Sequence, residues 1–244
     1  MTSSGIHIST DLDATIVDVM GSDDSILDAM LVSTAKDINR RPRGEKEPGQ
    51  KDKDRGRLNF LMKNRHGTPF EHTAMTVRIH APIFVVREWQ RHRVQSYNEQ
   101  SGRYTQFEPK FYVPHEHRPL VQQGKPGRYE FVKGTQHQDD IAVLAHYEAF
   151  RVAWEQYEAM IEEGVAMEVA RNVLPLATYT NFYATANIRA WLHFLGLRTK
   201  DENALYPSYP LWEIERLALQ VEDMVIANFP ITHEVWDRNG RVAP

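Results

Sequence analysis

The sequence predicts an α+β fold, a mixed sheet packed by helices, in a single domain that spans residues 1–244. Three observations lead to this prediction. Helical patterns outnumber strand patterns, the strand patterns are scattered between the helices, and the chain shows no internal repeat or low-complexity tract. With 41% apolar and 10% aromatic residues, a chain of 244 residues can bury a sizeable core.

Composition excludes several classes of protein. A formal net charge of −4 gives no general basic field that would hold nucleic acid non-specifically. The absence of cysteine removes disulfides, thiolate metal ligands and any cysteine nucleophile. Residues 1–8 lack a basic region followed by an apolar run, and no stretch approaches the roughly 20 apolar residues that span a bilayer. We therefore expect a soluble, cytoplasmic protein without a signal peptide.

The first third of the chain predicts a strand, two helices and a long loop. The apolar run Ala14–Met20 is strand-like, and a turn leads into a helix over Ser25–Val32. Residues 40–57 combine prolines, glycines and many charges, which predicts a flexible solvated loop. Leu58–Lys63 is a short helical piece.

The middle of the chain alternates between strand and helix. From Met75 onward, apolar and polar residues alternate as in a half-buried strand. Pro82 opens a helix that runs to about Arg91, because proline suits the first helical turn. Phe107–Val113 is a short strand, and residues 115–135, rich in Gly, Pro, His and charge, predict a second flexible loop.

The last part of the chain is mainly helical. A long helix is expected over residues 139–163, and a shorter one over Met167–Leu174. The apolar stripe of the long helix is Ile141, Leu144, Tyr147, Trp154, Tyr157 and Ile161. Thr178–Ala186 is β-branched and aromatic, which leaves strand or buried turn open. A helix follows over Asn187–Leu197, and a last one runs from Pro210 to Pro230.

The stretch Arg91–Tyr104, hereafter the signature stretch, carries the clearest functional signal. Val94 is its only aliphatic residue, so the stretch is not core. A solvated face would be the ordinary interpretation of such a run. Two features favour anion binding instead. Arginines close together in sequence suit a bridging anion, and Ser101-Gly102 offers backbone N–H groups beside a residue that tolerates positive φ.

The signature stretch resembles a known family. Arg-His-Arg, seven residues and a serine resemble the Arg-His-Arg-x7-Ser signature of the flavin-dependent thymidylate synthases. The matched positions are Arg91, His92, Arg93, Asn98, Glu99, Ser101, Gly102, Arg103 and Tyr104. The resemblance extends from about Val17 to Ile226. It implies the fold of that family and a methyltransferase and flavoprotein that makes dTMP from dUMP. The implied cofactor is FAD, with 5,10-methylenetetrahydrofolate and NADPH as co-substrates, in a homotetramer whose active sites are shared between subunits.

The same resemblance implies roles for individual residues. Flavin contacts are expected from Ser33, His66, Thr68, Glu71, Arg91, His92, Arg93, Glu99, Asn187, Arg189 and His193. Nucleotide contacts are expected from Glu88, Arg91, Glu99, Gln100, Ser101, Gly102, Arg103, Arg171 and Arg198. Three of these residues are expected to act in catalysis. Arg198 would stabilise negative charge on the uracil carbonyl, Ser101 would donate a hydroxyl hydrogen bond, and His66 would order the flavin ring.

Some of the same residues also suggest other chemistry. Ser101 resembles a nucleophile, but no Asp-His relay lies near it in sequence, so hydrogen bonding to the phosphate or the pyrimidine is favoured. His66, Glu71 and His72 suggest a zinc site. Their spacing is not that of His-Glu-x-x-His, and Pro69 breaks any helical register, so no metal is expected.

Two arginines also have structural interpretations. Glu168, Arg171 and Asn172 share one helix face, which is compatible with a surface ion pair alone. Arg198 ends a helix, where the dipole stabilises any cation. The resemblance favours nucleotide contacts for both arginines.

The sequence departs from the family pattern at several positions. Glu88 stands where a glutamine is expected, Leu31 where an arginine is common, and Leu211 where a glutamine is usual. Residues 200–212 are longer than usual. These departures bear on nucleotide contacts more than on the cofactor.

Two rival functions remain at this point. One is a nucleic-acid-binding module that uses the alternation of arginine and tyrosine, which the acidic net charge disfavours. The other is a flavin-dependent enzyme that modifies a different pyrimidine nucleotide, for example by hydroxymethylation of dUMP.

Overall fold

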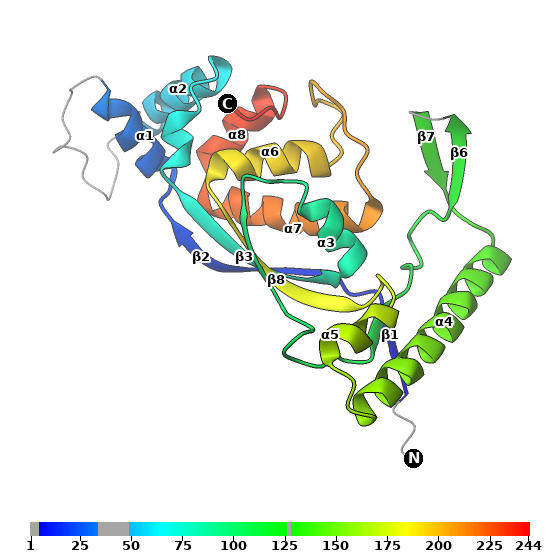
Figure 1. The fold of residues 1–244 in the computed structure, drawn as a ribbon. Helices are drawn as coiled ribbons and strands as arrows, with labels where there is room; N and C mark the ends of the chain where they lie inside the picture. The colour runs from blue at the N-terminus through cyan, green and yellow to red at the C-terminus, as the bar shows by residue number, and fades with distance from the viewer. Residues whose placement is uncertain (1–4, 34–48, 126–127) are drawn as a thin grey trace. The chain divides into compact units, whose positions relative to one another are not determined.

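The computed structural model describes residues 5–33, 49–125 and 128–244 and shows two compact units (Figure 1). The first unit comprises residues 5–11, 80–88 and 99–181 of this described part. The second comprises residues 12–33, 49–79, 89–98 and 182–244. The chain passes from one unit to the other inside β3 (Ala74–Pro82), β4 (Ser96–Glu99) and β8 (Tyr179–Ala186). These strands and β2 form a four-stranded sheet in the order β2-β3-β8-β4, and the α+β class is confirmed.

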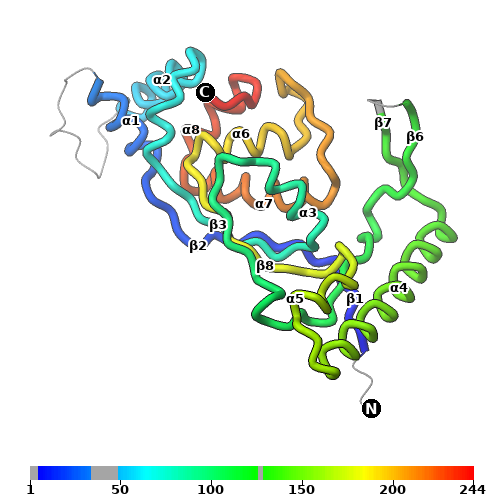
Figure 2. The backbone as a smooth tube through the Cα atoms, viewed as in Figure 1, coloured from blue at the N-terminus to red at the C-terminus, as the bar shows by residue number. Residues whose placement is uncertain are grey.

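The second unit carries most of the helices, and the tube in Figure 2 follows their order. Its further elements are β2 (Asp13–Met20), α1 (Asp23–Val32), α2 (Gln50–Lys63), η1 (Thr68–Glu71), α6 (Ile188–Arg198), α7 (Trp212–Asn228) and α8 (Pro230–Arg238). Side chains define where the helices begin. Ser22 and Ser25 form a capping box at α1, and Asn187 Oδ1 accepts the Ala190 N–H at 2.9 Å to begin α6.

An aromatic cluster forms the centre of the second unit. The ring centroids of Trp89 and Phe194 lie 4.4 Å apart, and Trp191 and Phe182 meet Trp89 edge to face. All four side chains are buried. Trp191 Nε1 also donates to Met75 O at 3.1 Å, which ties α6 to β3. Because Trp89 lies only two residues before the signature stretch, the cluster fixes the start of that stretch against α6.

The first unit is built around one long helix. Its elements are β1 (His7–Ser9), α3 (Ile83–Trp89, whose last residue belongs to the second unit), β5 (Lys110–Tyr112), β6 (Val121–Lys125), β7 (Arg128–Val132), α4 (Gln136–Glu162), α5 (Met167–Ala170) and η2 (Arg171–Val173). β1 pairs with β5 in parallel, and β6 pairs with β7 in antiparallel register. Phe111, Phe150, Trp154 and Tyr157 form its core.

Two of the predicted loops are wrong where the structure describes them. Residues 50–57 form the first half of α2, while residues 40–48 lie outside the described residues. Polar pairs within the helix support it, since Gln50 donates to Asp54 at 2.8 Å and Arg55 pairs with Asp52 at 2.7 Å. The range 115–135 contains the hairpin β6–β7, in which Gln122 pairs with Phe131. Cross-strand pairs outweigh the loop-like composition there.

Three helix predictions also need correction. Ile141 and Leu144 of the expected stripe on α4 are exposed, whereas Trp154 and Tyr157 are buried. The helix expected over residues 167–174 becomes a 3-10 turn after Ala170, ahead of Pro175. Pro230 does not only end a helix but also begins α8, for which its fixed φ is suited. None of the helices in the described part of the chain combines the length and apolarity that a membrane crossing needs.

The beginning of α8 depends on a buried carboxylate from another element. Asp23 accepts hydrogen bonds from Ile231 N at 2.9 Å, Thr232 N at 3.0 Å and Thr232 Oγ1 at 2.6 Å. We expect Asp23→Ala to lower the free energy of unfolding by about 2–3 kcal/mol, because three buried donors lose their acceptor. Asp52→Ala, at an exposed position, should cost less than about 1 kcal/mol. Urea denaturation at pH 7 measures both, and equal losses would contradict the prediction.

Candidate functional site: a cationic cavity in the second unit

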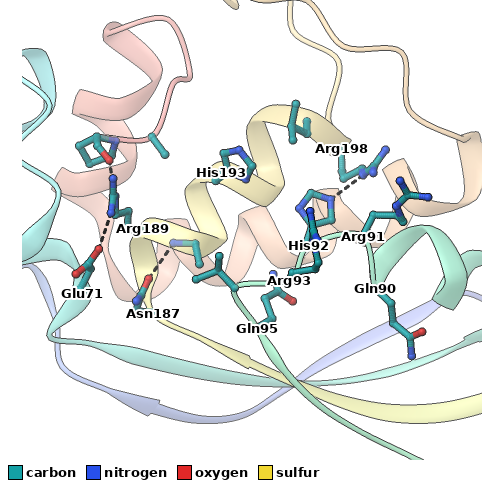
Figure 3. A pocket seen from close by; sticks show the side chains of 15 residues that line it. Glu71, Gln90, Arg91, His92, Arg93, Gln95, Asn187, Arg189, His193 and Arg198 are labelled. Atoms are coloured by element: carbon teal, nitrogen blue, oxygen red, sulfur yellow. Dashed lines mark hydrogen bonds and ion pairs between the residues drawn. The ribbon is translucent and has the colours of Figure 1, made fainter.

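The second unit contains a cavity of about 820 Å³, within the range of small-molecule sites (Figure 3). Eight residues predicted to bind the flavin or the nucleotide line it, namely Glu71, Arg91, His92, Arg93, Asn187, Arg189, His193 and Arg198. The other lining residues are Gln90, Val94, Gln95, Ala190, Leu197, Ala243 and Pro244. The residues come from η1, from Gln90 and the signature stretch that follows it, from α6 with its N-cap, and from the segment after α8.

Arg91 and Arg93 give the cavity its charge. Both side chains are exposed, and among the residues that the structure describes neither side chain forms an ion pair or a hydrogen bond. Two guanidinium groups held without carboxylate partners attract a bidentate anion such as a phosphate. The donor set of this cavity therefore fits a phosphate-bearing cofactor.

His92 lies between these two arginines in sequence but is buried. Its Nε2 accepts a hydrogen bond from Arg198 Nε at 2.9 Å, and its ring packs edge to face against Phe194 at 4.8 Å between centroids. Because arginine is a donor only, this contact requires an unprotonated Nε2. Burial, the Arg198 charge and His193 lower the pKa of His92 to about 4. His92 is therefore a neutral acceptor that holds Arg198 at the cavity.

Arg189 is held at the opposite end of α6. Its Nε donates to Pro244 O at 2.5 Å, and its Nη1 pairs with Glu71 Oε1 at 2.5 Å (Figure 3). Two contacts on different nitrogens fix the plane of the guanidinium group. Asn187 is fixed as well, because its Oδ1 serves as the helix cap.

The rest of the signature stretch anchors the arginines to the core. Gln95 Oε1 accepts from Trp89 Nε1 at 3.1 Å, and the Tyr97 hydroxyl donates to His92 O at 2.6 Å. Burial raises the pKa of Tyr97 to about 12, so the hydroxyl keeps its proton at neutral pH. We did not predict a role for Gln95 from the sequence, although it lies inside the signature stretch.

The predicted nucleotide contacts are divided between the units. Arg91 and Arg198 line the cavity of the second unit, whereas Glu88, Glu99, Gln100, Ser101, Gly102, Arg103 and Arg171 belong to the first unit.

A tight turn shapes the part of the first unit for which the sequence predicts anion binding. Ser101 O accepts the Tyr104 N–H at 3.1 Å, and Ser101 Oγ accepts the Arg103 N–H at 3.3 Å. Since Oγ acts as acceptor there, its own proton is free to point at a ligand. A side chain at Gly102 would overlap the Phe107 ring, so only glycine fits at this close approach.

The two arginines beside this turn differ in their partners. Arg103 Nε pairs with Glu168 Oε2 at 2.9 Å, with both side chains 53% exposed, so the pair contributes little stability and a ligand anion can compete for the arginine. Arg171 is half-buried, lies next to Gly102, and its side chain forms no hydrogen bond or ion pair within the described ranges. Nearby, Glu99 Oε1 accepts from Thr180 Oγ1 at 3.0 Å, which fixes the carboxylate on β8.

Four predicted flavin contacts do not line the cavity, namely Glu99, which belongs to the first unit, and Ser33, Thr68 and His66 of the second unit. Ser33 is exposed at the end of α1, Thr68 is exposed at the start of η1, and exposed His66 meets Phe60 edge to face at 5.6 Å. Within the described ranges, no three or more His, Asp or Glu side chains form a group that could hold a metal ion. Ala243 and Pro244 line the cavity but follow the last recognisable pattern, so no sequence signal predicts their role.

Comparisons with known proteins show which family the chain resembles. The family described as thymidylate synthase complementing protein matches residues 15–231. The flavin-dependent thymidylate synthase of Streptomyces avermitilis is 46% identical over 240 residues, which cover 96% of this chain and 94% of that protein. That of Tropheryma whipplei is 46% identical over 193 residues, 79% of this chain and 80% of that protein.

A solved structure is similar over nearly the whole chain. It is the UMP/dUMP methylase PolB from Streptomyces cacaoi bound with 5-Br dUMP, with a TM-score of 0.90, 42% identity, and coverage of 98% of this chain and 100% of that chain. The same methylase bound with 5-Br UMP gives a TM-score of 0.89. The protein therefore belongs to the flavin-dependent thymidylate synthase family. The family recognised from the signature stretch is confirmed, as is its assignment as an enzyme that uses a flavin.

The neutral state of buried His92 predicts a specific pH dependence. An unfolded His92 takes up a proton below its ordinary pKa of 6.5, but the folded residue does so only at about 4. Between these values the unfolded state binds more protons, so the contribution of His92 to stability falls as the pH falls. We expect the stability advantage of the unsubstituted protein over His92→Gln to shrink with a slope of up to about 1.4 kcal/mol per pH unit in this window.

Urea titrations from pH 7 to pH 4.5 measure this slope. His137→Gln is the matched control, because its side chain is exposed. A difference between the unsubstituted protein and His92→Gln that stays constant over this range would contradict a neutral buried imidazole.

Proposed function

We propose that this protein catalyses the FAD-dependent reductive methylation of dUMP to dTMP, with 5,10-methylenetetrahydrofolate as carbon donor and NADPH as reductant. The observation that carries the proposal is the cavity lined by Arg91, Arg93, Arg189 and Arg198, in which neutral His92 accepts a hydrogen bond from Arg198. It suits a cofactor with a pyrophosphate, and the relatives named above are flavin-dependent thymidylate synthases and a dUMP methylase.

The composition supports a route without covalent addition to the enzyme. Methylation at C5 of uracil requires an electron-rich C5, which a cysteine thiolate can create by adding to C6. This chain has no cysteine. Bound reduced flavin supplies a hydride, while the protein provides positioning and electrostatic stabilisation.

Individual residues have distinct parts in this proposal. Arg198, held by neutral His92, stabilises negative charge that develops on the uracil carbonyl. Arg171 and Arg103 bind the nucleotide phosphate together with the Ser101 hydroxyl and the Gly102 N–H. Glu71 contributes through Arg189, whose guanidinium plane it fixes beside the cofactor.

A second candidate substrate follows from the solved relative. PolB is a UMP/dUMP methylase whose structure was determined with 5-Br UMP as well as with 5-Br dUMP. UMP methylation by this chain is therefore the alternative with specific support. Formation of an oxygenated, hydroxymethyl product is the other alternative, which the carboxylate at Glu88 keeps open.

We further propose a cytoplasmic homotetramer with active sites shared between subunits, as the family resemblance implies. Exposed apolar side chains on α4 support association, since Ile141 and Leu144 are 53% and 62% exposed. Light scattering of the purified protein tests the oligomeric state.

Release of tritium from C5-labelled nucleotide tests the reaction itself. The protein is supplied with FAD, NADPH and methylenetetrahydrofolate, and either dUMP or UMP, and the product mass is read from the same sample. Tritium release with dTMP supports the proposal. Turnover of UMP alone, or an oxygenated product, would replace it with one of the alternatives. Absence of both flavin binding and release would refute it.

Arg198→Ala should lower kcat about 100-fold at saturating dUMP, because a donor to the developing oxyanion is lost. The KM for dUMP is expected to change little. His92→Gln should lower kcat less than Arg198→Ala does, because a glutamine oxygen can still accept a hydrogen bond from Arg198. Steady-state kinetics distinguish the two variants, and near-normal kcat for Arg198→Ala would refute its catalytic role.

Arg171→Ala and Arg103→Ala should act through affinity instead. Loss of a charge-assisted contact to the phosphate is expected to raise KM for dUMP at least about tenfold with kcat little changed. Arg216→Ala, an exposed arginine of α7 outside the cavity lining, is the control. A fall in kcat without a rise in KM would contradict phosphate binding by Arg171 and Arg103.

A further inference from the structure

The segment Arg241–Pro244 is an unexpected part of the cavity wall. It follows α8, and its last two residues, Ala243 and Pro244, line the cavity. The chain reverses at Gly240 and Arg241, with φ of +79° and +58°. Arginine seldom adopts a left-handed conformation, so contacts elsewhere must hold this residue.

The buried guanidinium of Arg241 supplies these contacts. Nη2 donates to both carboxylate oxygens of Glu222 and to Thr199 Oγ1, each at 2.8 Å. Nη1 pairs with Asp237 at 2.9 Å, and the group lies over the Trp236 ring at 4.3 Å from its centroid. Because Arg241 is only 7% exposed and these contacts hold its guanidinium group, its position in the second unit is fixed.

The backbone of the segment in turn engages two arginines near the cavity. Arg65 Nη1 donates to Val242 O at 2.7 Å and to Ala243 O at 3.1 Å. Arg189 Nε donates to Pro244 O, as described above. Gly67 packs behind this pair, since a Cβ there would lie 2.5 Å from Arg189 Nε and 3.0 Å from Pro244 O.

The same segment lies along the helix that carries the cavity residues. At Gly196, a Cβ would come within 2.6 Å of Arg241 O, so α6 and the segment approach at backbone distance. Thr199, which Arg241 contacts, follows Arg198 at the end of α6. The segment therefore contacts α6 at its N-terminal turn through Arg189 and at its C-terminal end through Thr199.

We propose that the segment Arg241–Pro244 is a positioning element of the flavin site, which Arg241 fixes and which aims Arg189 at the cofactor. Arg241 does not line the cavity and acts only through its neighbours. This inference rests on the proposed function in one respect, because it assumes that the flavin occupies this cavity.

Three variants test the inference with FAD as the probe. One variant ends at Arg241 and so lacks the carbonyl acceptors of Arg65 and Arg189. Gly67→Ala displaces Arg189 and Pro244 from one another without touching Arg241. Gly56→Ala is the matched control, because a Cβ at Gly56, in α2, meets nothing within 4 Å. The readouts are the Kd for FAD by fluorescence titration and the Tm of the protein without FAD.

We expect the shortened protein and Gly67→Ala to raise the Kd for FAD about tenfold or more while their Tm values change by only a few degrees. Gly56→Ala should keep the Kd within about twofold. Arg241→Lys, which retains the charge but loses the fork geometry, should also weaken FAD binding. If Arg241→Lys does not fold, the first two variants decide.

Two outcomes overturn the inference while the proposed function stands. In the first, the full chain binds FAD and the shortened protein and Gly67→Ala bind it equally well. In the second, the Kd rises only in proportion to a loss of Tm, which would make the segment merely structural. A full chain that binds no FAD would instead refute the proposed function along with the inference.

Discussion

Four arginines line one cavity, and two of them, Arg91 and Arg93, have no carboxylate partner among the described residues, so the site depends on how their repulsion is offset. The packing of Trp89 against α6 provides the offset. Trp89 is buried against Trp191 and Phe194 and lies two residues before the signature stretch. Burial of large aromatic side chains is among the strongest stabilising terms in a core. This packing fixes the arginines of the signature stretch beside α6, in a position that electrostatics alone would disfavour.

The histidine in the signature stretch shows how this packing also sets protonation. An exposed imidazole between two arginines would be a further cationic donor or a solvated ring. Buried on Phe194, His92 stays neutral at physiological pH, with its pKa lowered to about 4 by burial first and by the Arg198 charge second. It can then accept from Arg198 instead of repelling it. The aromatic core thus determines both the position and the direction of Arg198.

The two arginines at the ends of α6 are held by different means. Arg198 relies on a side chain of the signature stretch, whereas Arg189 relies on Glu71 and on a backbone carbonyl that a buried ion network keeps in place. The direction of the Pro244 oxygen is set by the chain around it. This difference makes Arg189 sensitive to packing at Gly67 and Arg198 sensitive to substitution of His92.

The sequence by itself determined the family, the fold class and most of the residues around the cavity. Local patterns suffice for this, because the signature stretch is contiguous and because α6 shows its N-cap at Asn187 and its apolar period directly. The local pattern gave wrong predictions within residues 50–57 and 115–135, where polar composition suggested loops. Side-chain pairs stabilise a helix in the first range, and cross-strand pairs stabilise a hairpin in the second.

Only the tertiary structure decided the rest. It placed Ala243 and Pro244 beside Arg189, some 50 residues away in sequence, and joined Arg241 to Glu222 and Thr199. It also left Ser33, His66 and Thr68 outside the cavity lining. Contacts between segments distant in sequence leave no periodic signal, because their geometry depends on how whole elements pack and not on the residues next to them in the chain.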